Sequence, residues 1–168
     1  MLDDAREVAV TTVELGIEPT HHRRVYGCDS PTFEELPRRL IIASRRFVLF
    51  VAADFGSLTG INTTLAQLLD CGCVYLCAWG PGCEELHDAM DYVASAQELD
   101  GAPERTIMTT WHSGDSLEEA AEFAVHWADP DEDLAEGCDS VVLASIGNSK
   151  WGVDLARIGT VHVRQGVI

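Results

Sequence analysis

Four apolar runs of strand length recur along the chain, and each ends in turn residues. The runs are FVLFVAA, VYLCAW, TIMTTW and SVVLASI, at positions 47–53, 74–79, 106–111 and 140–146. Because the apolar positions are largely continuous rather than alternating, both faces of each strand are expected to be covered, as in a parallel sheet flanked by helices. The pattern therefore predicts four central strands in one parallel sheet.

Segments with helical periodicity follow the first three runs. They predict helices near residues 62–71, 83–97 and 116–128. Asn62 is a suitable N-cap and Gly72 a suitable stop signal for the first helix. Ser116 and Glu119 have the spacing of a capping box at the start of the third. Strands and helices in this alternation require right-handed crossovers, which predicts an α/β fold, a three-layer sandwich with a mainly parallel central sheet of the Rossmann-like or flavodoxin-like kind.

The two ends of the chain follow less regular patterns. Residues 30–44 are expected to form a helix that is kinked or restarts at Pro37, because proline removes a helical hydrogen bond. Residues 7–15 and 160–165 alternate between apolar and polar positions, which predicts two additional edge strands.

Length and composition fit one soluble domain. A chain of 168 residues with 46% hydrophobic residues can bury an adequate core without disulfides, so we expect a single α/β domain over residues 1–168. Its core is expected to span 45–168, after an N-terminal strand and helix extension over 1–44. The longest apolar run is far shorter than the roughly 20 residues that a membrane span requires. We therefore expect a cytoplasmic protein without a membrane partner, whose six cysteines are reduced thiols.

Acidic residues dominate the middle of the chain. Residues 47–149 hold nineteen Asp and Glu residues but only one Lys or Arg, which is Arg105. Phosphate backbones are held chiefly by Lys and Arg, so this composition argues against a nucleic acid partner. A basic protein partner fits the charge, although a solvated acidic surface also accounts for it.

Polar and aromatic side chains follow the predicted strands at the point where each strand ends. The carboxyl ends of parallel strands meet at one edge of a sheet, and ligands usually bind there. The predicted ligand-binding residues at this edge are Asp54, Trp79, Trp111, Asn148 and Ser149. The predicted catalytic residues are Cys83, Glu84, His87 and His112. We expect Cys83, His87 and His112 to lie together beside Asp54 and Asn148 in one partly enclosed cleft.

Cys83 and His87 allow three interpretations. They are four residues apart at a predicted helix start, so their side chains project from one face, and with His112 they make a suitable ligand set for zinc, with Glu84 or Asp54 as general base. Alternatively, Cys83 is a nucleophile that His87 or His112 deprotonates. In the third interpretation, Cys83 and His87 belong to the core. The spacing matches no zinc signature and no nucleophile elbow, so no metal or cofactor is assigned.

Four short segments resemble an uncharacterised bacterial α/β domain of unknown function. They are Cys-x-Trp-Gly-Pro, Cys-Glu-x-x-His-Asp, Thr-Thr-Trp-His and Ile-Gly-Asn, at 77–81, 83–88, 109–112 and 146–148. The similar region extends from about residue 45 to 152. The resemblance implies a domain that is shared among proteins, and no activity comes with it.

Two functions from different classes remain open. A small enzyme or ligand sensor with a cleft at the carboxyl edge explains why polar and titratable residues gather at the strand ends. An acidic interaction module, of the immunity or adaptor type, explains the acidic stretch and would bind a basic protein. A closed pocket favours a small-molecule ligand, whereas exposed tryptophan on an acidic face favours a protein partner.

Overall fold

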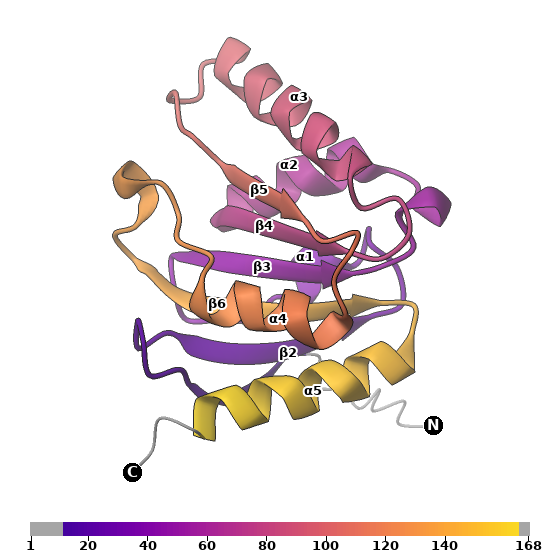
Figure 1. Ribbon diagram of the computed structural model, residues 1–168. Helices are drawn as coiled ribbons and strands as arrows, with labels where there is room; N and C mark the ends of the chain where they lie inside the picture. Colours follow the sequence, from indigo (N-terminus) through magenta and orange to yellow (C-terminus); the bar gives the residue numbers. More distant parts are fainter. Residues whose placement is uncertain (1–11, 165–168) are drawn as a thin grey trace, which may run out of the picture.

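A mixed six-stranded sheet forms the centre of the structure, a computed structural model that describes residues 12–164 (Figure 1). The strands lie in the order β1-β2-β6-β3-β4-β5. Their bounds are β1 (Thr12–Ile17), β2 (Arg24–Ser30), β3 (Arg46–Ala52), β4 (Cys73–Trp79), β5 (Met108–Trp111) and β6 (Cys138–Ile146). Helices alternate with the strands from β2 onward, so the predicted α/β class is confirmed.

The four apolar runs form β3, β4, β5 and β6. Strand β3 pairs with β6 on one side and with β4 on the other, and β5 pairs with β4. All three pairings are parallel, which confirms the prediction of four parallel strands. The sheet continues beyond β6 with β2, which is parallel to β6, and with β1, which is antiparallel to β2.

Helices cover both faces of the sheet. One face carries α1 (Leu36–Arg39), α2 (Ile61–Cys71) and α3 (Glu85–Leu99), and the other carries α4 (Leu117–His126) and α5 (Ser149–Arg164), which lie in front of the sheet in Figure 1. Along β3, Leu49 and Val51 pack toward α2 and α3, whereas Val48 and Phe50 pack on the opposite face. All four side chains are fully buried, which explains why the sequence of this strand is continuously apolar.

Helix ends follow the sequence signals in two of three cases. The capping box is present, with Glu119 N–H donating to Ser116 Oγ at 3.1 Å and Ser116 N–H donating to Glu119 Oε2 at 2.9 Å. Gly72 ends α2 with a φ of 108°, as predicted. Asn62 is not the N-cap of α2, because the helix begins at Ile61 and Gly60, with a φ of 64°, takes that position.

The C-terminal strand prediction was wrong. Residues 160–164 belong to α5, in which the buried residues Leu155, Ile158, Gly159, His162 and Val163 have helical spacing. The alternation of apolar and polar residues over 160–165 is a short part of this longer helical pattern. Residue 165 lies outside the described residues.

The N-terminal predictions hold only in part. The helix expected over 30–44 is reduced to α1, which has Pro37 in its first turn and ends when Leu40 leaves helical geometry. Of the strand expected over 7–15, residues 12–15 lie in β1, and 7–11 are outside the described residues. Strand β2 was not predicted, because Gly27 and Asp29 interrupt its apolar pattern.

The path of the chain creates a reversal between β3 and β6. The chain advances from β3 through β4 to β5 with α2 and α3 on one face, and α4 then returns it across the other face to β6, beside β3. The segments that follow β3 and β6 therefore lead to opposite faces of the sheet. In α/β sheets such a reversal leaves a crevice beyond the carboxyl ends of the two strands.

Candidate functional site

A cavity of about 480 Å³ opens at this reversal. It lies among the segments that follow β2, β3 and β6. Residues that line it include Phe33, Glu34, Asp54, Ser57, Asn148 and Trp151. Two of the predicted ligand-binding residues, Asp54 and Asn148, thus share one cavity, which we call the switch-point cavity.

The backbone beyond each strand fixes Asp54 and Asn148. Asp54 Oδ1 accepts a hydrogen bond from Gly56 N–H at 3.2 Å, which caps a short 3-10 turn, η1 (Phe55–Ser57). On the other side, Asn148 Oδ1 accepts the N–H of Trp151 at 3.1 Å in the first turn of α5. Each side chain therefore has one oxygen held by local backbone, and both residues line the cavity.

Glu34 and Thr59 join two loops of the cavity. Thr59 Oγ1 donates to Glu34 Oε1 at 3.0 Å, and this oxygen would lie 2.9 Å from a Cβ on Gly60. The carboxylate is therefore next to the N-terminus of α2, where a negative charge is favourable. With Asp54, it gives the cavity two carboxylates, and no Lys, Arg or His is among its described lining residues.

Two tryptophans connect this cavity with the end of β4. The ring of Trp151 meets that of Trp79 edge to face, with centroids 5.3 Å apart. Trp79 Nε1 donates to the carbonyl of Asp115 at 2.9 Å. Trp79 is thus fixed by packing and by a hydrogen bond, and it lines a second cavity rather than the first. Ser149 lines a third, of about 420 Å³, on the β2 side.

The second cavity, of about 350 Å³, lies at the end of β4 and β5 and brings together Trp79, Cys83, Glu84 and His112. His112 Nδ1 is 2.9 Å from Asp115 Oδ2, and its Nε2 is 3.1 Å from Thr110 Oγ1. The carboxylate favours a proton on Nδ1, so Nε2 accepts from the threonine hydroxyl. Its ring also contacts Phe123 of α4, at a centroid distance of 4.9 Å. Both ring nitrogens therefore have partners within the protein.

Of the three residues expected to lie together, Cys83 and His112 line the second cavity, whereas His87 is not among its lining residues. Cys83 lies in the turn before α3, is 1% exposed, and packs in the core on the α2–α3 face. The ring of His87 contacts Trp111, and its Nε2 is 3.3 Å from Asp91 Oδ2. The described residues contain no group of three His, Cys, Asp or Glu side chains arranged to hold a metal ion.

Four of the other five cysteines are buried, and Cys71 is exposed. All six are free thiols. Burial raises the pKa of Cys77 to about 12 and also raises the pKa of Cys73. A thiol with a raised pKa is a poor nucleophile at neutral pH, so these side chains serve packing.

The sequence reasoning did not select Glu34, Trp151 and Asp115. Asp115 had a readable signal, because it follows His112 by three residues in a turn. Glu34 and Trp151 had none, because they come from segments whose secondary structure was not correctly predicted. Whether any of these side chains has a functional role stays a prediction.

Comparison with known proteins identifies a family whose description assigns no activity. A family model described as Domain of unknown function (DUF7684) matches residues 25–159. The chain belongs to this family. The matched region runs from the second residue of β2 past β6 and includes the three cavities described above. None of the curated proteins matches the chain. None of the described helices is long and apolar enough to cross a membrane.

Proposed function

We propose that this chain is a small-molecule-binding domain whose switch-point cavity takes an amine, that is, a small polar molecule with an ammonium group. The observation that carries the proposal is the presence of two carboxylates, Glu34 and Asp54, in a cavity whose described lining has no basic side chain. The cavity also lies where ligands bind in Rossmann-like and flavodoxin-like three-layer sandwiches, the fold we infer for this single domain.

The other lining side chains suit the same ligand class. An ammonium group donates hydrogen bonds and is stabilised by carboxylates and by aromatic rings, and Trp151 and Phe33 are aromatic residues of the lining. Ser57 and Asn148 would hydrogen-bond the neutral polar part of the ligand. An anionic ligand, a nucleic acid included, would meet only negative charge. We place the protein in the bacterial cytoplasm and leave open whether it also catalyses a reaction.

Binding can be tested with one isosteric substitution. Asp54→Asn removes the charge but keeps an oxygen that can accept from Gly56 N–H, so the fold should be retained. Calorimetric titration with amino acids, polyamines and amino sugars should find an amine that binds, and the variant should lose about tenfold or more in affinity. Asp139→Asn, an exposed residue of β6 at the opposite end of the sheet, should leave affinity unchanged. A preference for anions, or equal affinity in Asp54→Asn, would contradict the proposal.

A basic protein partner is the second candidate, and exposed tryptophan at a sheet edge favours it. Trp111 is 43% exposed on β5, an edge strand flanked by acidic helices. An extended basic segment could pair with this edge. Titration with an arginine-rich β-strand peptide should give binding that Trp111→Ser weakens and that salt suppresses. Equal binding of a glutamate-rich peptide would exclude this function.

A further inference from the structure

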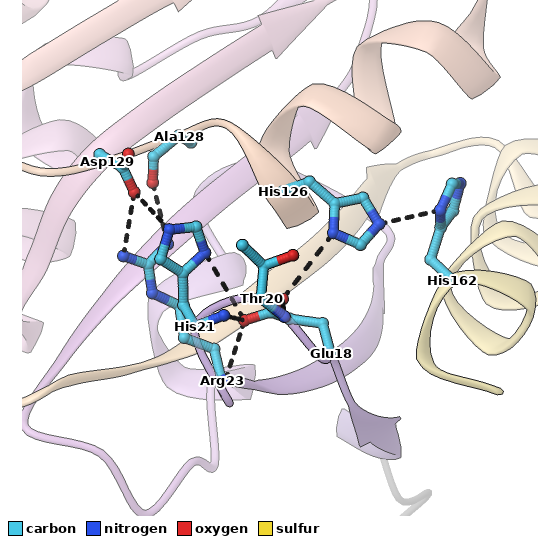
Figure 2. Close-up of polar contacts among 8 residues, drawn as sticks. All are labelled: Glu18, Thr20, His21, Arg23, His126, Ala128, Asp129 and His162. Carbon is cyan, nitrogen blue, oxygen red and sulfur yellow. Dashed lines mark hydrogen bonds and ion pairs between the residues drawn. The ribbon is translucent and has the colours of Figure 1, made fainter. Parts of the chain in front are cut away.

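Glu18 is a buried carboxylate at the end of the sheet opposite the switch-point cavity. It follows β1, is 0% exposed, and accepts backbone N–H groups of the turn that leads to β2 (Figure 2). Its Oε2 accepts from Thr20 at 2.7 Å, and its Oε1 accepts from His21 at 2.7 Å and from Arg23 at 3.1 Å. The carboxylate is thereby fixed in place, and a buried charge held in this way attracts protons on neighbouring groups.

Two histidines from different helices meet beside this carboxylate. His126 is the last residue of α4, and His162 lies in the last turn of α5. His126 Nε2 is 3.0 Å from His162 Nδ1, and His126 Nδ1 is 3.8 Å from Glu18 Oε2 (Figure 2). His162 is 9% exposed, so the contact is largely shielded from water. The three side chains therefore join α5, α4 and the β1–β2 turn.

The number of protons on the two imidazoles decides whether this contact exists. With no added proton, Glu18 favours the tautomer of His126 that carries Nδ1–H, so Nε2 accepts the Nδ1–H of His162. One added proton on His162 keeps that hydrogen bond, because His162 Nδ1 remains a donor. A second proton, on His126 Nε2, puts two N–H groups and two positive charges against each other at 3.0 Å. The doubly protonated pair cannot keep the contact.

Other charged groups around the pair do not cancel this repulsion. Those that face His126 are Glu18 and His21 from the turn, Glu122 from α4 and His162 from α5. His21 is itself held between Glu18 and Asp129, and Arg23 is 3.5 Å from Asp129. Burial and then His162 lower the pKa of His126, although Glu18 and Glu122 oppose the shift. The folded protein thus takes up a proton on His126 less readily than a free imidazole does.

We propose that Glu18, His126 and His162 form a proton-operated clasp, which holds the C-terminal half of α5 against α4 and the β1–β2 turn at neutral pH and releases it on acidification. The consequence is local, because α5 packs on β1, β2 and β6, whereas α4 packs on β3 and β4. Acid should therefore loosen this corner of the molecule before the rest unfolds. The clasp is independent of the amine site proposed above.

Hydrogen exchange followed by mass spectrometry tests the clasp. Rates would be compared at about pH 7.5 and about pH 5.5, one unit on either side of the usual imidazole pKa of about 6.5, after correction for intrinsic exchange. Peptides from β1 and from the second half of α5 should exchange faster at the lower pH, by up to about tenfold, and peptides from β3 should not change. Equal corrected rates at both pH values would overturn the proposal.

Substitutions separate the clasp from general acid sensitivity. His126→Gln with His162→Asn places amide groups near the positions of Nε2 and Nδ1, and these groups do not titrate. This double variant should lose the pH response of α5. His22→Asn is the control, because it removes an exposed imidazole from the same turn, and its φ of 58° suits asparagine. It should respond as the unsubstituted protein does.

Two further outcomes keep the test decisive. If the double variant retains the acid-induced exchange of α5, the histidines are not the cause and the proposal fails. If the double variant does not fold, His162→Asn alone and imidazole nitrogen NMR of the unsubstituted protein replace it. The NMR must then show the hydrogen bond between the two rings disappearing over the same pH range as the rise in α5 exchange, and its persistence would overturn the clasp.

Discussion

Gly80 shows at the residue scale why β4 can turn so close to the end of β3. Its φ is 119°, and a Cβ at this position would lie 2.0 Å from the carbonyl oxygen of Ala53. Backbone hydrogen bonds hold the two ends together, from Ala53 N–H to the Trp79 carbonyl at 3.1 Å and from Phe55 N–H to the Pro81 carbonyl at 2.7 Å. The Gly-Pro-Gly segment is therefore a structural junction that places Asp54.

Gly80→Ala should destabilise the protein by about 2 kcal/mol or more, because the backbone conformation and the contact with Ala53 both exclude a Cβ. Urea denaturation would measure the change in the free energy of unfolding. Gly114→Ala is the matched control, since a Cβ there meets nothing within 4 Å. The control should stay within about 0.5 kcal/mol of the unsubstituted protein. Similar stability for both variants would show that the Gly80 junction can relax.

His112 is the second test at this scale, because it separates a core role from a catalytic one. It is 9% exposed and loses two hydrogen bonds and the Phe123 contact when truncated. His112→Ala should therefore cost about 2 kcal/mol in the free energy of unfolding, whereas His87→Ala, a more exposed residue, should cost less. Unchanged stability of His112→Ala, together with loss of a co-purifying ligand, would assign His112 to a functional site instead.

At the scale of single elements, the capping box at the start of α4 allows the stability contributed by a helix cap to be measured. Ser116→Ala removes the acceptor for Glu119 N–H, and the expected loss is about 1 kcal/mol in the free energy of unfolding. A double-mutant cycle with Glu119→Ala should reveal coupling between the two, because each caps the backbone of the other. Additive effects would mean that the reciprocal cap adds no stability.

The elements that the sequence predicts correctly are of two kinds. Some are strands buried on both faces, which are apolar throughout, and others are helices that begin with a capping residue. Phe47 and Val48 face opposite clusters, so β3 is apolar throughout, and Ser116 caps a helix by contacts within four residues. Strand β2 escapes such reasoning, since Gly27 lies in the middle of its pairing with β1 and β6 and the partners are distant in sequence. Helix α5 spans Ser149–Arg164, so the alternation within residues 160–165 covers only its last turns.

At the scale of the whole molecule, topology decides which predicted site residues meet. Asp54 and Asn148 share a cavity because β6 returns beside β3. Predicting that these two residues meet, and that Cys83 lies elsewhere, requires the order of the strands in the sheet. Cys83 and His112 share the second cavity, at the ends of β4 and β5, and neither lines the switch-point cavity. The sequence predicts the edge of the sheet at which polar side chains gather, whereas their partition into separate cavities depends on crossovers that residue patterns do not encode.

Helix α5 runs between two ends of the sheet, because it begins at the switch-point cavity and ends at the clasp of Glu18, His126 and His162. Its packing makes the overall stability depend on pH through His126. The pKa of His126 is lowered in the folded state, mainly by burial and then by His162, so the unfolded chain binds a proton more readily. The stability that neutral His126 provides is therefore complete above the unfolded pKa of about 6.5 and is lost as the pH falls through the folded value.

The free energy of unfolding, measured by urea denaturation from about pH 7.5 to about pH 5.5, should consequently fall more in the unsubstituted protein than in His126→Gln. The comparison between the two proteins matters more than either curve, since a net charge of −17 becomes smaller on acidification and the weaker self-repulsion stabilises both. A difference between the curves isolates the imidazole from this general effect. Parallel curves would show that His126 takes up its proton equally well in the folded and unfolded states, which the burial of its contact with His162 argues against.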